Sequence, residues 1–188
     1  MLGRTHDLAA FTTILLAAIF LPVPEFSIAT ALVCIMAAMV GGLLPDIDGA
    51  SSDFWKMIPV GEVLSRIVSP LIGKHRHLTH SFVGVVLVYF ISNWAIELVS
   101  PYVLVDHELV HVSFMLGYVS HLVMDSFTEA GIPLFLPFRF KFGIPPIRAV
   151  RIKTGGWFEK LLVFPGLVVL NGWLMWQYYG VLVGRIVV

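Results

Sequence analysis

The sequence predicts an all-α fold: a polytopic membrane helical bundle of about five transmembrane helices, forming one domain over residues 1–188. Hydrophobic residues make up 58% of the chain and charged residues 13%, whereas soluble domains are about 45–50% apolar and about 25% charged. The apolar residues gather in separate long runs, as in membrane proteins. Cys34 is the single cysteine, so neither an intramolecular disulfide nor a cysteine-based zinc site is expected.

Five apolar segments are expected to be membrane helices, since a bilayer core requires about 17–20 helical residues. The first is short and the fourth carries polar side chains. Small residues at Gly41, Gly42, Gly84 and Gly117 would allow close helix packing. The segments are Leu8–Leu21, Phe26–Leu44, Ser81–Val99, Leu109–Phe127 and Leu161–Val183.

The basic residues predict the orientation of these spans. Five crossings place the N-terminus and the long loops Pro45–His80 and Thr128–Lys160 on one side, and the C-terminus on the other. Of the 12 Lys and Arg residues, 11 fall on the first side, and the exception is Arg185. The positive-inside rule therefore predicts a cytoplasmic N-terminus and an external C-terminus.

Both long loops carry segments suited to the membrane surface. Asp53–Ile72 mixes apolar and charged residues and is expected to form an interfacial amphipathic helix broken at Pro59. Ile132–Ile152 interleaves phenylalanines with basic residues. Beside membrane spans this composition indicates a lipid-facing anchor, so membrane lipid is the expected partner and nucleic acid is not.

Seven metal-capable residues are expected at one membrane face, because the predicted threading brings their separate stretches to the same side. His121 and Asp125 are four residues apart and share one helical face, and ionisable groups inside a span normally face a bundle interior or a watery cavity. Asp46 and Asp48 are two apart, so an extended turn would point both carboxylates the same way. The predicted ligands are His6, Asp46, Asp48, His75, His80, His121 and Asp125.

Imidazole and carboxylate without thiolate suit Zn²⁺, with Mn²⁺ or Fe as alternatives. Seven ligands exceed the need of one tetrahedral ion, which predicts two or three ions. Such a site activates water and clamps phosphoryl oxygens. Arg76 and Asp48 are the predicted catalytic residues, with Arg76 stabilising negative charge that develops on the substrate. Lys74 fits a basic membrane flank better than a catalytic role.

The spacing of these residues resembles the YdjM family, which is described as inner-membrane, metal-dependent hydrolases. The matching pattern is Thr5-His6, Leu44-Pro45-Asp46-Ile47-Asp48, His75-Arg76-x-x-Thr79-His80-Ser81 and His121-x-x-x-Asp125, followed by Thr128 and Gly131. His77 stands where the family usually has glycine, so it is left out of the ligand set. Glu159 could correspond to an acidic family position.

The His-x-x-x-Asp element also resembles, more distantly, zinc-dependent phospholipase C and P1-type nucleases. This resemblance implies hydrolysis of a phosphoester, with a phosphorylated lipid or another membrane-associated ester as the substrate class.

A second motif offers an alternative. His107-Glu108-x-x-His111 matches the zincin signature, which would make the protein an intramembrane zinc protease. The motif lies on the predicted external side, about 15 Å from His121 at 1.5 Å per residue, so the two sites could not share a metal. A non-catalytic metal-binding membrane protein is the third hypothesis.

Overall fold

The computed structural model describes residues 1–49, 52–72, 78–138 and 140–187. It confirms that the chain is mostly helical. Each of the five predicted segments contains a helix, although the last is broken at Tyr178 into two. The long helices are α1 (Gly3–Phe20), α2 (Ile28–Leu43), α5 (Phe82–Val99), α6 (His107–Ser126) and α7 (Phe164–Gln177).

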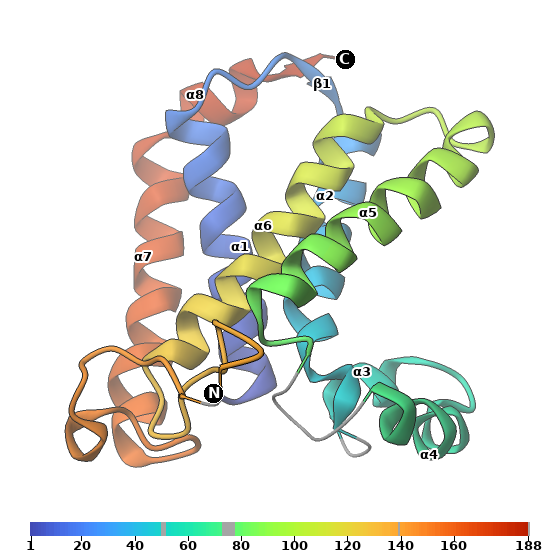
Figure 1. Cartoon of the computed structure of the whole chain (residues 1–188). Helices are drawn as coiled ribbons and strands as arrows, with labels where there is room; N and C mark the ends of the chain where they lie inside the picture. Colours follow the sequence, from blue (N-terminus) through green and yellow to red (C-terminus); the bar gives the residue numbers. More distant parts are fainter. Residues whose placement is uncertain (50–51, 73–77, 139, 188) are drawn as a thin grey trace.

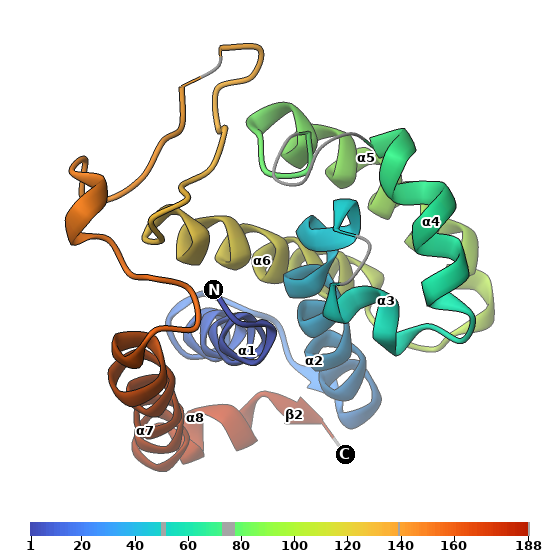
Figure 2. The ribbon, with the colours of Figure 1, turned by 90° about the horizontal axis from the view of Figure 1, so that it is seen from below.

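Helices α1, α2 and α6 form the centre of the bundle, with α7 against α1 and α5 on the outer side of α6 (Figures 1 and 2). The closest packing is between α2 and α6, where a Cβ on Gly41 would meet the carbonyl of Phe114 and one on Gly117 that of Ala38. Gly84 instead faces the backbone of Leu78, so it serves the turn into α5 and not a helix–helix contact. Close packing therefore fixes α2 against α6.

The chain distributes its connections between two ends of the bundle (Figure 1). The N-terminus, the segment between α2 and α5, and the loop between α6 and α7 lie at one end. The C-terminus and the β1–β2 pair lie at the other, with Phe26 beside Ile186 in parallel register. The remaining elements are β1 (Phe26–Ser27), η1 (Leu44–Asp48), α3 (Asp53–Met57), α4 (Gly61–Ile72), η2 (Ser100–Tyr102), η3 (Arg148–Val150), η4 (Glu159–Val163), α8 (Tyr179–Gly184) and β2 (Ile186–Val187).

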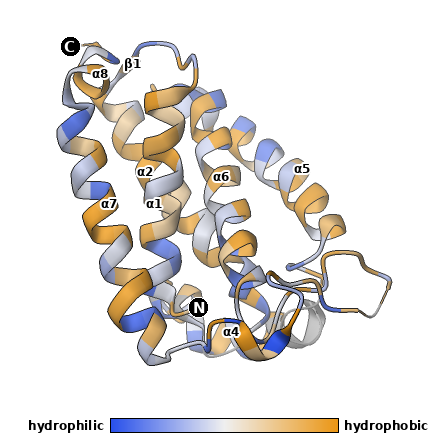
Figure 3. Cartoon of the chain, turned by 90° about the vertical axis from the view of Figure 1, so that its left-hand side faces the viewer, coloured by the Kyte–Doolittle hydropathy of each residue, from blue (hydrophilic) through white to orange (hydrophobic). Residues whose placement is uncertain are grey.

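Two helical stretches in the described part of the chain are long and apolar enough to cross a bilayer: Ile28–Asp48 and Phe82–Tyr102. The prediction of five spans is therefore not confirmed. The first turns of α1 and the last turns of α6 carry polar residues, and α7 is shorter than a span. Hydrophobic residues nevertheless extend along all the long helices (Figure 3).

The predicted surface helix over Asp53–Ile72 is present and is broken between α3 and α4, where Val60 adopts φ +63°. Its apolar residues Val63, Leu64 and Ile67 are exposed, as an interfacial helix requires. The Ile132–Ile152 segment is irregular and exposes Phe135 and Phe138.

Candidate metal centre

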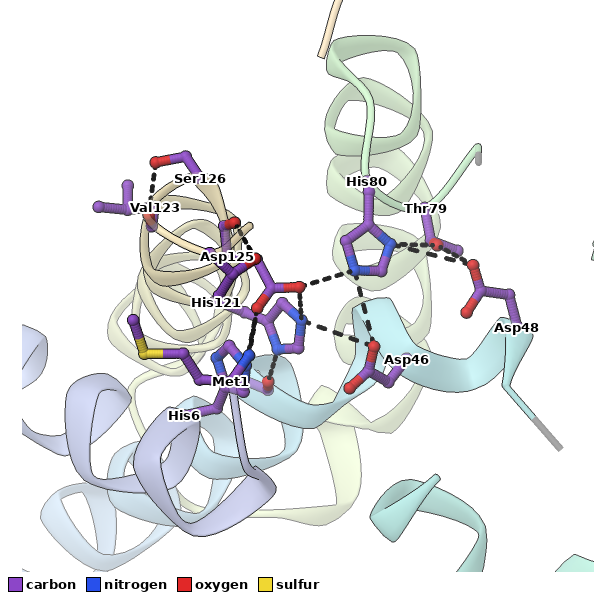
Figure 4. Close-up of polar contacts among 12 residues, drawn as sticks. Met1, His6, Asp46, Asp48, Thr79, His80, His121, Val123, Asp125 and Ser126 are labelled. Atoms are coloured by element: carbon purple, nitrogen blue, oxygen red, sulfur yellow. Dashed lines mark hydrogen bonds and ion pairs between the residues drawn. The ribbon is translucent and has the colours of Figure 1, made fainter. Parts of the chain in front are cut away.

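Six of the seven predicted ligands gather at the end of the bundle that holds the N-terminus (Figure 4). His6 lies in the second turn of α1, Asp46 and Asp48 in η1, and His121 and Asp125 in the last turns of α6. His80 precedes Ser81, whose hydroxyl accepts the Gly84 N–H and so caps α5. All are buried except Asp46, whose side chain is 26% exposed.

Two carboxylates, those of Asp46 and Asp125, each lie close to the same two imidazole nitrogens. Asp46 Oδ1 lies 3.6 Å from His80 Nε2 and 3.7 Å from His121 Nε2. Asp125 Oδ2 lies 3.8 and 3.9 Å from the same two nitrogens. Residues 46, 80, 121 and 125 are thus brought close together from η1, the turn before α5, and α6.

Asp125 extends this arrangement towards α1 through its other oxygen. Its Oδ1 lies 3.3 Å from His6 Nε2 and 2.5 Å from the amino group of Met1. The His6 ring stacks on His121, with centroids 3.7 Å apart and planes 11° apart. The donors form two overlapping metal-capable groups, His6–His121–Asp125 and Asp46–His80–His121. Asp125 therefore directs one oxygen towards His6 and the other towards His80 and His121.

Hydrogen bonds on the far side of two imidazoles fix their orientation. His121 Nδ1 lies 2.6 Å from the Gly42 carbonyl, which can only accept, so Nδ1 carries the proton. His80 Nδ1 lies 3.1 Å from the Thr79 hydroxyl, which donates to Asp48 Oδ2 at 3.1 Å. Because that hydroxyl has one proton, it must accept from His80 Nδ1. Both Nε2 atoms are therefore lone-pair donors aimed at the cluster, the usual state of metal-binding histidines.

Asp48 does not point with Asp46, contrary to the expectation of an extended turn. Pro45 starts a 3₁₀ helix over Leu44–Asp48 instead. At about three residues per turn, positions two apart diverge by about 120°. Asp46 therefore faces the cluster, whereas Asp48 reaches His80 from behind, through Thr79. The geometry gives Asp48 the place of an orienting partner.

The donor set fits a divalent metal. A tetrahedral zinc with bonds of about 2.0–2.1 Å has ligand–ligand distances of about 3.3–3.4 Å, and the four carboxylate–imidazole distances here are 3.6–3.9 Å. His121 Nε2 is buried, and the described residues offer it no hydrogen-bond partner. A fully buried lone-pair donor facing two carboxylates is electrostatically unfavourable without a cation or proton between them.

Glu159 fixes the start of α1 beside this centre. Its carboxylate is fully buried and accepts the N–H groups of Leu2 and Gly155, both at 2.7 Å. Burial alone would raise the pKa of Glu159, but these hydrogen bonds lower it below its ordinary value. Leu2 is the N-cap residue of α1, which lacks a capping side chain of its own. Glu159 thus caps α1 and, through it, sets the position of His6.

His75 and Arg76, predicted as ligand and catalytic residue, lie outside the described residues, as do Lys74 and His77. In the zincin motif, His111 makes hydrogen-bond contacts to a neighbouring helix. His111 Nε2 lies 3.0 Å from the Ser92 hydroxyl and 3.2 Å from the Tyr89 carbonyl, which ties α6 to α5. Among the described residues, His107, Glu108 and His111 form no metal-capable group.

Three supporting residues were not predicted to act at the site: Thr79, Gly42 and Tyr118. Tyr118 is fully buried and donates its hydroxyl to the Thr79 carbonyl. The only signal for Thr79 in the sequence was its place beside His80 in a dense polar motif. Gly42 acts through its backbone carbonyl, for which side-chain patterns give no signal.

Comparisons with known proteins find relatives of this chain in bacteria. The chain is 27% identical to the uncharacterized protein YvsG of Bacillus subtilis over 95% of its own length and 97% of that protein. It is 31% identical to the inner membrane protein YdjM of Escherichia coli over 58% of this chain, a match that spans 52% of that protein. No solved structure matches. The family model described as YdjM inner membrane protein matches residues 1–185, and the chain therefore belongs to the YdjM family.

Proposed function

We propose that this protein is a membrane-bound, metal-dependent hydrolase that acts on a phosphoester, such as that of a lipid, at the cytoplasmic face. The observation that carries the proposal is that Asp46 and Asp125 each lie 3.6–3.9 Å from the same two imidazole Nε2 atoms. Those imidazoles belong to His80 and His121, and both are held with the Nε2 lone pair facing the carboxylates. Family membership supports an inner-membrane location.

Some of the described residues would bind the metal, and others would orient the side chains that bind it. Residues 6, 46, 80, 121 and 125 would bind two or three ions, most simply zinc. Ions held there would lower the pKa of bound water and polarise a phosphoryl oxygen. Asp46 is the exposed member, so it marks the side from which substrate would enter. Arg76 remains the proposed anion-binding residue.

The two alternatives predict different results. A zinc protease would need His107 and His111, but His111 Nε2 is occupied by contacts to α5. A metal carrier would use the same cluster without turnover. The buried, rigidly oriented cluster favours a retained ion over one released for transport.

The test is metal content and turnover of detergent-purified protein. His121→Ala and Asp125→Asn should lose bound zinc and phosphodiesterase activity on a chromogenic ester while retaining helicity. His111→Ala is the matched control, since it removes a buried histidine ten residues away on the same helix and should retain both. Loss of metal in His111→Ala but not in His121→Ala would overturn the assignment of the site. Full metal without turnover on a panel of phosphoesters would overturn the hydrolase.

A further inference from the structure

An apolar cavity lies in the half of the bundle away from the candidate metal centre. It has a volume of about 300 Å³ and is formed mainly by α1, α2 and α6, with residues of α7, α8 and β2 completing its wall. Its lining is almost wholly apolar and includes Phe11, Ala18, Ala31, Ile35 and Leu116. This volume lies at the lower end of the range for small-molecule sites.

The cavity is separate from the metal centre. Between them, α1, α2 and α6 meet through small residues without space for a ligand: a Cβ on Gly42 would lie 3.1 Å from Ala10 Cβ. Gly117 packs in the same way against the Ala38 backbone, and Ala10 and Ala38 are fully buried. The helices close at this layer and diverge beyond it, so the cavity does not extend the metal site.

The lining is unsuited to water. A stable buried water needs about two to four polar partners, and the only polar side chains among the described residues that line the cavity are Cys34 and Ser113. In an inner-membrane protein, the abundant apolar molecule of matching shape is a lipid acyl chain. Because α2 is itself a candidate span, its cavity-facing residues lie at bilayer depth.

A cation stands at the rim of the same cavity. Arg185 joins α8 to β2 and donates to the carbonyls of Leu21 and Val23, and Val23, Leu182 and Ile186 belong to the cavity wall. In the predicted topology, the other 11 Lys and Arg residues lie on the opposite side of the membrane from Arg185. It therefore supplies the positive charge at this end, where an anionic headgroup would lie if its chain entered the cavity.

We propose that this cavity binds one acyl chain of an anionic phospholipid, with the phosphate of the headgroup beside Arg185. The bound chain would fill the space where α1 diverges from α2 and α6. The site is independent of the proposed hydrolase activity, because the packed layer of small residues separates the two.

The test uses the full chain in proteoliposomes that contain phosphatidylglycerol with a photoactivatable diazirine on one acyl chain, followed by mass-spectrometric mapping of adducts. Adducts are expected on Ile35 and Leu116 in the wild type. Ala31→Phe, which fills the cavity, should reduce them at least fivefold. Ala95→Phe, on the exposed face of α5, is the matched control and should leave them unchanged.

Metal content and thermal unfolding establish that each variant folds, and Ala18→Leu replaces Ala31→Phe if that variant does not. Arg185→Gln should remove the preference for phosphatidylglycerol over phosphatidylcholine carrying the same diazirine chain. Adducts confined to outward residues such as Phe90, or unchanged cavity adducts in the filled variant, would overturn the site. Equal labelling of wild type by both lipids would overturn the role of Arg185.

Discussion

The closest helix contact in the bundle leads to a quantitative prediction for Gly117→Ala. Gly117 lies on α6 one turn before His121, against the backbone of Ala38 on α2. Alanine normally stabilises a helix by about 1 kcal/mol relative to glycine. Here the added methyl would clash with the Ala38 carbonyl oxygen. Overpacking of this kind costs about 1–3 kcal/mol.

Separation of α2 from α6 would also stretch the bond from His121 Nδ1 to the Gly42 carbonyl, which has a net value of about 1 kcal/mol. The balance is a destabilisation of about 1–3 kcal/mol. Because that bond orients a histidine of the proposed metal centre, zinc affinity should fall about 10–100-fold. The matched control is Gly172→Ala on α7, where an added Cβ meets nothing within 4 Å and stability should rise by about 1 kcal/mol.

Both quantities are measurable in detergent: stability by chemical unfolding followed by circular dichroism, and affinity by competition with a chromophoric zinc chelator. If Gly117→Ala were as stable as Gly172→Ala and bound zinc like the wild type, the coupling of this helix contact to the metal centre would be refuted.

Three further predictions concern single polar contacts. Thr79→Val should keep the fold but weaken zinc binding about 10–100-fold, because it removes the hydroxyl that links Asp48 to His80. The control is Thr13→Val, which removes only a hydrogen bond within its own helix and should leave zinc binding unchanged. Glu159→Gln should lower the melting temperature most at pH 7, and the difference from wild type should shrink as pH falls below 4.5. The pKa of Glu159 is lowered in the folded state, so protonation of this carboxylate at low pH removes the stability that its ionised form contributes to the wild type. A difference that grows on acidification would contradict this. His111→Ala should cost about 1–2 kcal/mol in unfolding experiments without loss of zinc, since it removes a bond between α5 and α6.

The helical fold and the ends at which its connections lie could be predicted from the sequence, because both depend on apolar runs and their order. The residues at which the helices begin and end could not be predicted in the same way. The run of apolar residues predicts that the first helix starts at Leu8, yet α1 begins at Gly3, because the Glu159 carboxylate, 157 residues away, accepts the Leu2 N–H at its start. The break between α7 and α8 at Tyr178 was also missed, since neither glycine nor proline marks that position.

The membership of the cluster could largely be predicted, but the role of each member could not. His121 and Asp125 were correctly placed together, because a spacing of four on a helix is geometric. Asp46 and Asp48 were given equal roles, and a 3₁₀ helix in place of an extended turn separates them. Local backbone conformation therefore decides which carboxylate faces the metal-capable group and which one orients a histidine.

The two histidine motifs on α6 show why spacing alone does not define a metal site. His107 with His111 and His121 with Asp125 have the same four-residue spacing, and each pair offers metal-capable atoms on one helical face. What differs is the neighbour: α5 presents a hydroxyl and a carbonyl to His111, whereas η1 and the start of α5 present Asp46 and His80 to His121. A hydroxyl and a carbonyl satisfy a neutral imidazole by hydrogen bonding, whereas two carboxylates and a second imidazole lone pair favour a cation or a proton between them. The surrounding elements, and not the motif, therefore make one site structural and the other a candidate metal centre.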